Sequence, residues 1–328
     1  MARREIQLFS FVAGALLLLV SLSYAQQLPA TSAGKKTLTV KSTVITESVL
    51  AQNTAVRTRL AAFYGIDPAG PSQDVAHDLA ILLNLGALPP NSVGSGDITK
   101  IFRAAARPWQ ESVQVQATVN IYYAYAAVGG ELTFVTWDGV SRTWSAIILI
   151  NNDGQTGHFA WYLDPAPNDD NEWLTPFEVS ADLGGGTINT GRCFVEGVGV
   201  AGDLSHFDLK TTVMHALGHA LLLSVANPYF SNLVADGYFH IEAPLVGAGS
   251  LIPAASNNFG FTSHIEPVVN FVNGTYVDVL DWALMAAVRP GVRCYPSTAD
   301  ALVVAIMEVG LNPTVNDNPQ FWRAVDRH

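Results

Sequence analysis

The chain has 328 residues, 49% of them hydrophobic, and its 17 lysines and arginines against 28 aspartates and glutamates give a formal net charge of −11 at pH 7. This length and apolar content are enough to bury one large core or two modest ones. So acidic a balance argues against nucleic acid and against an anionic membrane surface as partners.

The first residues are typical of a secretory signal peptide. Arg3 and Arg4 precede an apolar run over residues 9–22, and the Ser-Tyr-Ala of residues 23–25 suits a cleavage site. The run is shorter than the ~20 residues that a membrane-spanning helix needs. We therefore predict a signal peptide over residues 1–25, a secreted or periplasmic mature protein, and no membrane association after cleavage.

Residues 26–95 are predicted to form a polar linker followed by a helical segment. Residues 46–66 and 74–86 show helical spacing of their apolar positions, and they are separated by the Pro-Ala-Gly-Pro stretch at 68–71. A removable prosegment and a set of helices packed on the main domain both fit this pattern.

The main domain is predicted over residues 96–328, and it opens with a helix and strands. The helix is expected from Asp97 through Ala106, ahead of Pro108. Strands are then expected where apolar residues alternate over 113–123, and again over 132–137. The run Ala-Ile-Ile-Leu-Ile at 146–150 is apolar on both faces, as a central strand would be.

The second half of the main domain is predicted to hold two helices joined by irregular chain. The first is expected from Ser205, which with Asp208 matches a capping box, through about Leu223. Asp208 either caps this helix or hydrogen-bonds a metal ligand. A closing helix is expected from Ser297 to Val309. This order of elements is typical of the α+β class.

Two cysteines, Cys193 and Cys294, are present in the chain. In an oxidising compartment they favour one disulfide, which would close a loop of about 100 residues. Two buried free thiols are the alternative. A cysteine metal site is disfavoured because no CxxC pair occurs.

His215 and His219 stand four residues apart in an apolar helical stretch. Residues at this spacing share one face of a helix, about 6 Å apart, so that both imidazoles can reach one metal ion. Histidines that serve as ordinary core or cap residues are the alternative. Burying two unpaired imidazoles in so hydrophobic a helix is costly unless something satisfies them, and a zinc ion would do so.

Residues 206–221 (His-Phe-Asp-Leu-Lys-Thr-Thr-Val-Met-His-Ala-Leu-Gly-His-Ala-Leu) resemble the active-site helix of zincin metallopeptidases, whose signature is HExxH. The later Asp-Trp-Ala-Leu-Met of residues 281–285 resembles the Met-turn of the metzincins, which underlies the metal site. Residues 291–302 resemble the entry to that family's closing helix, and residues 160–170 resemble a segment of its secreted bacterial members. The resemblance covers residues 97–315 and implies a zincin-like fold with a mixed sheet, an active-site helix, an irregular C-terminal lobe and a closing helix.

The chain departs from the family pattern at the residue after the first histidine. There the family has a glutamate that acts as general base, and this chain has Ala216. The compact HExxHxxGxxH form is also absent, because Leu222 and Val225 occupy the positions of its glycine and third histidine. The sequence leaves open whether Ala216 is the natural residue or a deliberate substitution.

The third metal ligand must then come from elsewhere. Some metzincins, leishmanolysin-like in this respect, take it from a loop shortly before the Met-turn, and His264 fits that place. The resemblance therefore implies zinc as cofactor, held by His215, His219 and His264 above Met285. A surface loop position is the alternative for His264, with His240 as the reserve ligand.

The function implied is that of a secreted zinc metallopeptidase-family protein that takes a peptide or protein substrate. Its catalysis is expected to be impaired because Ala216 cannot carry a proton, unless another carboxylate compensates; Glu266, Asp278 and Glu196 are the candidates. A non-catalytic zinc-binding pseudoprotease that binds peptides or proteins is the first alternative. A helical surface protein with an accidental histidine pair is the second. The sequence says nothing of the substrate or the oligomeric state.

Overall fold

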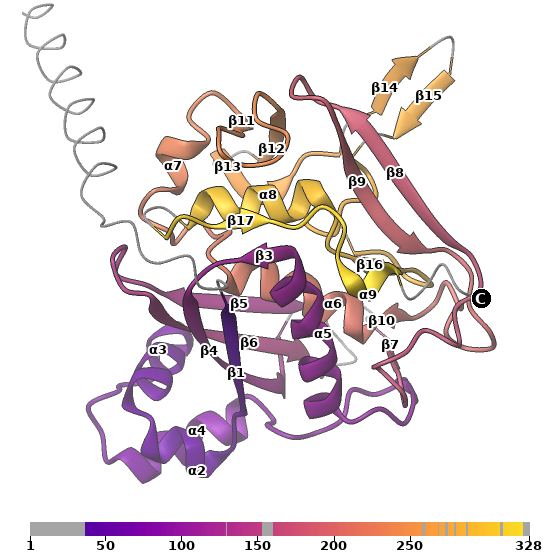
Figure 1. Cartoon of the computed structure of the whole chain (residues 1–328). Helices are drawn as coiled ribbons and strands as arrows, with labels where there is room; N and C mark the ends of the chain where they lie inside the picture. Colours follow the sequence, from indigo (N-terminus) through magenta and orange to yellow (C-terminus); the bar gives the residue numbers. More distant parts are fainter. Residues whose placement is uncertain are drawn as a thin grey trace, which may run out of the picture.

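The fold was analysed in a computed structural model of the chain (Figure 1), which describes residues 37–128, 130–152, 160–257, 260–267, 269–272, 275–278, 280–286, 288–308 and 311–323. The predicted signal peptide lies outside these residues. Within them, no helix combines the length and the hydropathy that crossing a membrane requires.

A four-stranded mixed sheet forms the centre of the molecule. Its apolar run at 146–150 lies in an inner strand, as predicted, and the alternation over 117–123 places every second side chain in the core. The three parallel strands are followed by one antiparallel strand at the edge, in the order β1 (Leu38–Val44), β4 (Ala117–Ala126), β6 (Thr143–Asn151) and β5 (Glu131–Thr136).

Helices cover both faces of this sheet (Figure 1). One face packs against α5 (Ile98–Ser112) and α6 (Leu209–Ala220), which contact one another in the larger core. The other face carries Ile147 and Leu149, and these pack with the three short helices α2 (Glu47–Gln52), α3 (Thr54–Tyr64) and α4 (Ser72–Leu82).

The N-terminal segment is therefore built into the main domain. Residues 38–44 form a strand of the central sheet, and the helices that follow cover its outer face. Of the two arrangements that the pattern allowed, this is the packed one. Removal of residues 26–95 as a prosegment stays a prediction.

Three predicted helix limits in the main domain are wrong, one of them the end of the histidine helix, which stops at Ala220 and not near Leu223. The helix expected to stop before Pro108 continues through it to Ser112, because Trp109 is fully buried and its Nε1 donates to the carbonyl of Met214, 2.7 Å away. This packing outweighs the backbone hydrogen bond that proline removes. The helix expected from Ser205 begins at Leu209, since Phe207 and Asp208 form a short strand.

The closing helix α8 (Thr298–Met307) matches its prediction more closely. Ser297 is its N-cap, and Asp300 completes a reciprocal capping box.

Short sheets and helices make up the rest of the described chain. Three of the small sheets have three strands, in the spatial orders β10 (Phe207–Asp208), β7 (Trp161–Leu163), β2 (Val93–Gly94); β16 (Arg293–Tyr295), β9 (Thr187–Phe194), β8 (Pro176–Asp182); and β11 (Tyr238–His240), β12 (Leu251–Asn257), β13 (Gly260–Ile265). The other two are the pairs β14 (Val269–Val272) with β15 (Thr275–Asp278), and β17 (Thr314–Val315) with β3 (Val113–Gln114). The short helices are α7 (Phe230–Leu233) and α9 (Gln320–Arg323). The chain is an α+β protein with a mixed sheet.

A buried ion cluster joins the start of α6 to the C-terminal lobe. The guanidinium of Arg293 is fully buried and donates to Asp208 and Asp164 at 2.7–3.0 Å, and to Asp170 at 2.9 Å. Burial alone would lower the pKa of Arg293, but the carboxylates, Asp208 foremost, raise it well above its usual value. Because the cation is fully paired, its desolvation is offset.

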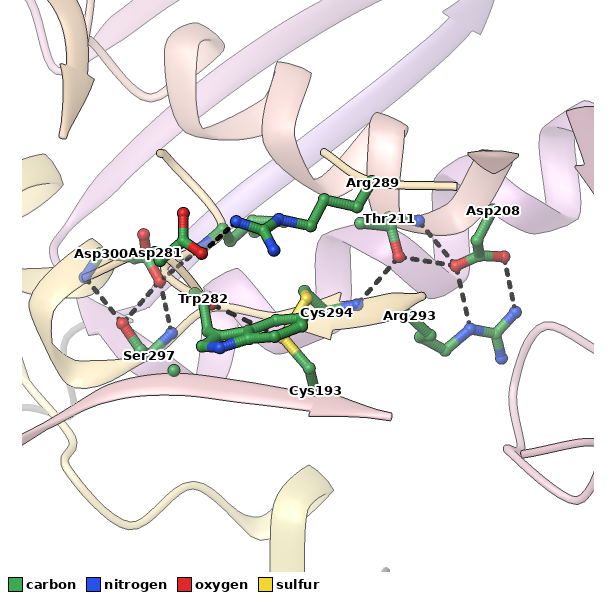
Figure 2. The surroundings of a disulfide bond; sticks show 12 residues. Cys193, Asp208, Thr211, Asp281, Trp282, Arg289, Arg293, Cys294, Ser297 and Asp300 are labelled. Carbon is green, nitrogen blue, oxygen red and sulfur yellow. Dashed lines mark hydrogen bonds and ion pairs between the residues drawn. A yellow bond between two sulfur atoms is a disulfide. The ribbon is translucent and has the colours of Figure 1, made fainter. Parts of the chain in front are cut away.

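The predicted disulfide is confirmed (Figure 2). Cys193 in β9 bonds to Cys294 in β16, and the two residues lie opposite each other in the antiparallel pair. The bond closes a loop over a sequence separation of 101 residues. It therefore ties the strand that leads into α8 to the β8–β9 hairpin.

We expect the Cys193→Ala/Cys294→Ala double variant to be less stable than the parent by roughly 4–5 kcal/mol, because the disulfide restricts the unfolded chain over a long loop. Urea unfolding of the oxidised parent, the reduced parent and the variant measures the difference. Equal midpoints for the oxidised parent and the variant would contradict the expectation.

Candidate metal centre

The helix that carries the histidine pair begins with a side-chain cap. Asp208 caps α6 by accepting hydrogen bonds from the backbone N and the Oγ1 of Thr211, at 3.0 and 2.7 Å. Of the two roles proposed for Asp208, capping is the one the structure shows. Every residue of α6 is buried, so the helix is held by packing along its whole length.

The three histidines singled out by sequence lie together. His215 and His219 come from α6 and His264 from β13, and one nitrogen of each lies within 4.8 Å of the others. The ring centroid of His264 is 5.2 Å from that of His215 and 4.8 Å from that of His219. Among the described residues, this is the group of side chains able to hold a metal ion.

The reserve candidate His240 lies elsewhere. It is an exposed residue of β11, and its Nε2 is 2.7 Å from the carboxylate of Asp236. His240 is not part of the three-histidine group.

Backbone carbonyls fix the orientation of the two helical imidazoles. The Nδ1 of His215 is 2.8 Å from the carbonyl oxygen of Leu284, and the Nδ1 of His219 is 2.7 Å from that of Leu223. Because a carbonyl oxygen can only accept, each Nδ1 carries the proton and donates it. Each Nε2 is then left with a free lone pair, and the two Nε2 atoms are 3.1 Å apart. Two lone pairs this close repel unless a cation lies between them, so this donor set fits a metal ion.

The protonation state of the site also suits metal binding. Burial, with His264 nearby, lowers the pKa of His215 to about 4. Burial and the neighbouring histidines lower the pKa of His219 well below its usual value, and burial lowers that of His264. All three are therefore neutral near pH 7, which is the form that coordinates metals.

A turn beneath the histidines contains Met285, which is fully buried. A Cβ on Gly218 of α6 would lie 2.3 Å from the Sδ of Met285 and 3.0 Å from Trp109. The absence of a side chain at Gly218 therefore lets Met285 pack closely against the helix. The sequence indicated this close packing, because a glycine inside a helix costs ~1 kcal/mol relative to alanine and usually has a packing reason.

The same turn connects the first and third histidines. The carbonyl of Leu284 accepts from His215, and the carbonyl of Met285 accepts from the backbone N of Ile265, the residue after His264, at 3.0 Å. In turn, the buried carboxylate of Asp300 accepts from the backbone N of Leu284 at 3.0 Å and of Met285 at 2.8 Å. Asp300 thus acts on the site through the turn, a role that the predicted closing helix did not reveal.

Ala216, between the two histidines, faces the core and is 0% exposed. Of the candidate carboxylates, the two whose side chains the structure describes, Glu196 and Glu266, are not part of the metal-capable group. Glu196 accepts from the hydroxyl of Thr175 at 2.7 Å, and Glu266 is exposed. The side chain of Asp278 lies outside the described residues.

Comparison with protein-family models, with curated protein sequences and with solved structures gave no match.

The low pKa of His215 predicts how the metal-free protein responds to acid. Its folded-state pKa of about 4 lies below the ordinary 6.5, so the unfolded chain takes up a proton first as pH falls. The stability contributed by the neutral histidine is thus present above pH 6.5 and is lost between about 6.5 and 4, by at most ~3 kcal/mol. Urea unfolding of the metal-depleted parent and of His215→Gln across this pH range measures the loss of stability. If the free energy of unfolding changed with pH in the same way in both proteins, the prediction would be wrong.

Proposed function

We propose that this chain is a secreted zinc-binding protein of the metzincin type, whose site takes a peptide and whose power to hydrolyse it is impaired by Ala216. The observation that carries the proposal is the convergence of His215, His219 and His264 beside the turn that contains the buried Met285. Three protein ligands are typical of a catalytic zinc site, which keeps its fourth position open.

The choice of zinc rests on the ligand set. Neutral imidazole nitrogens suit zinc, and each helical histidine donates its other ring N–H to a carbonyl, as metal-ligating histidines usually do. A structural zinc site usually has four protein ligands, whereas this group has three. When bound, the zinc ion would supply Lewis-acid polarisation of a carbonyl oxygen.

The backbone at Leu222 supports the likeness to the metzincin helix. Leu222 stands where many metzincins have a glycine, and its φ of +78° lies in the left-handed region that favours glycine. The chain therefore keeps the turn conformation while carrying a leucine, at a strain of roughly 1–2 kcal/mol.

A peptide is the partner that the surrounding fold favours. Among the described strands, β5 pairs on one side with β6 alone, and it packs beside α6 (Figure 1). An extended peptide can add to such an edge through backbone hydrogen bonds. A peptide bound there would lie next to the helix that carries the histidines.

Ala216 sets the limit on catalysis. Its methyl group can neither take nor give a proton, and general acid–base assistance is typically worth ~10²–10⁴-fold in rate. Because Ala216 has no part in holding the three imidazoles, zinc affinity is independent of it. This observation favours a pseudoprotease that binds peptides as the second candidate function.

An extracytoplasmic location agrees with this proposal. The disulfide between Cys193 and Cys294 requires an oxidising compartment to persist. The signal sequence expected over residues 1–25 would deliver the chain there.

We expect the purified protein to contain one zinc ion per chain and His264→Ala to bind zinc at least tenfold more weakly, because one of three ligands is lost. Metal analysis and competition with a chromogenic chelator measure both. The matched control is His240→Ala, which removes an exposed histidine outside the site and should leave zinc affinity unchanged. Equal zinc affinity in the parent and in His264→Ala would show that His264 is not a zinc ligand.

Restoring the carboxylate tests the function itself. We expect Ala216→Glu to hydrolyse a quenched fluorescent peptide library ~10²–10⁴-fold faster than the parent, at equal zinc content. The control Ala216→Gln has nearly the same size and cannot accept a proton, so it should stay at the parent's rate. If Ala216→Glu is folded and zinc-loaded but gains nothing, the three-histidine group is not a protease site. If the parent itself cleaves rapidly, catalysis is not impaired.

A further inference from the structure

A cavity lies between the irregular lobe and the end of the closing helix. It has a volume of about 550 Å³ and is lined by α7, by residues 240 and 242–245, by the end of α8 and by residues 312–314. It shares no lining residue with the three-histidine group. Glu308, the C-cap residue of α8, is part of its wall, and we call it the Glu308 cavity.

Glu308 is the unusual group in this cavity. The residue is 0% exposed, and neither oxygen of its carboxyl group has a hydrogen-bond partner. Leaving a polar group buried and unpaired costs ~1–3 kcal/mol, and more for a charge. Such groups are rare in native proteins and usually have a functional reason or a missing partner.

The surroundings of Glu308 lack the cation that would pair with it. The described lining of the cavity contains no lysine and no arginine, and it adds a second carboxylate, Glu242. Glu308 also sits at the C-terminal end of α8, where the helix dipole is negative and favours a cation. The local field therefore attracts positive charge that the cavity does not itself supply.

The rest of the lining favours a ligand with an apolar part. Leu233, Leu245, Ile306 and Pro313 contribute hydrocarbon surface. A metal ion is disfavoured, because the group of described side chains able to hold one is at His215, His219 and His264. An organic cation on a hydrocarbon stem matches both the carboxyl group and the walls.

We propose that the Glu308 cavity is a binding site for a guanidinium or ammonium group on an apolar stem, with the Glu308 carboxylate as its counter-ion. The side chain of an arginine or lysine has this chemistry, and so does a free alkylamine. The site is independent of zinc and of peptide hydrolysis.

The proposal implies that binding releases a proton. Burial raises the pKa of Glu308 well above its usual value, so the free carboxyl group is protonated under conditions where an exposed glutamate is ionised. A bound cation favours the ionised form, and the proton leaves to solvent. His240 and Glu242 are the other titratable groups in the described lining.

The test is calorimetric titration of the full-length mature protein with n-butylguanidinium. We expect binding that is tighter than that of 1-butanol, and Glu308→Gln should weaken it by roughly tenfold or more, the usual value of a charge-assisted hydrogen bond. The matched control is Glu242→Gln, an exposed lining residue that should change affinity by less than about threefold. Unchanged affinity in Glu308→Gln, or 1-butanol binding as tightly as n-butylguanidinium, would overturn the proposal.

Proton release gives a second readout that needs no substitution at 308. Titrations of the parent in two buffers of different ionisation enthalpy should show protons released on binding, and His240→Gln should release as many. No release by the parent would contradict the ionisation of Glu308. Urea unfolding of Glu308→Gln checks its fold, and we expect no loss of stability because a neutral amide replaces an unpaired carboxyl group.

Two peptides identify the source of the cation. Capped Gly-Arg-Gly should bind through its arginine, and the same tripeptide with citrulline, which is neutral and of similar shape, should not. Binding of the arginine peptide assigns the site to peptide side chains, and binding of n-butylguanidinium alone assigns it to free cations. Equal binding of the citrulline peptide would show that the charge has no role and would overturn the proposal.

Discussion

The geometry of the histidine site depends on one buried carboxylate. Asp300 accepts hydrogen bonds from two consecutive backbone amides, those of Leu284 and Met285. These bonds fix the turn whose two carbonyls hold His215 on one side and the strand of His264 on the other. Because Asp300 belongs to the first turn of α8, the docking of that helix determines where three imidazoles from two distant segments meet. Burial raises the pKa of Asp300 even though four hydrogen bonds favour its charged form, which shows how far it is removed from solvent.

The opposite end of the site is held by charge and by a covalent bond. Asp208 caps α6 and also pairs with Arg293 of β16, so that the start of the histidine helix is attached to the C-terminal lobe (Figure 2). The next residue, Cys294, is bonded to Cys193, and its backbone N donates to Thr211 in the first turn of α6. A fully paired arginine adds little net stability compared with apolar packing, but it permits few alternative arrangements of the helix and the lobe.

Sequence predicted the parts of this site that follow from local spacing. The i, i+4 histidines and the closing helix that starts at Ser297 are read from neighbouring positions, and the structure places them close to where they were expected. His264 came from family resemblance, because nothing local ties a strand residue to a helix some 45 positions earlier. Pro108 and Ser205 misled the prediction, since tertiary packing overrode the local signals of both. The unpaired burial of Glu308 depends on how distant segments pack, so sequence could not reveal it.

Several features of the site cost free energy, and they do not depend on the missing proton-transfer group at residue 216. Two imidazole nitrogens with lone pairs 3.1 Å apart are unfavourable without a cation, and a left-handed leucine at 222 adds strain. Gly218 lowers the helix propensity of α6, and it leaves the space in which Met285 packs against this helix. Each of these features costs free energy in the metal-free chain, and a bound cation offsets the first of them. None of them involves residue 216. The features that fit a metal ion are therefore separate from the residue at 216.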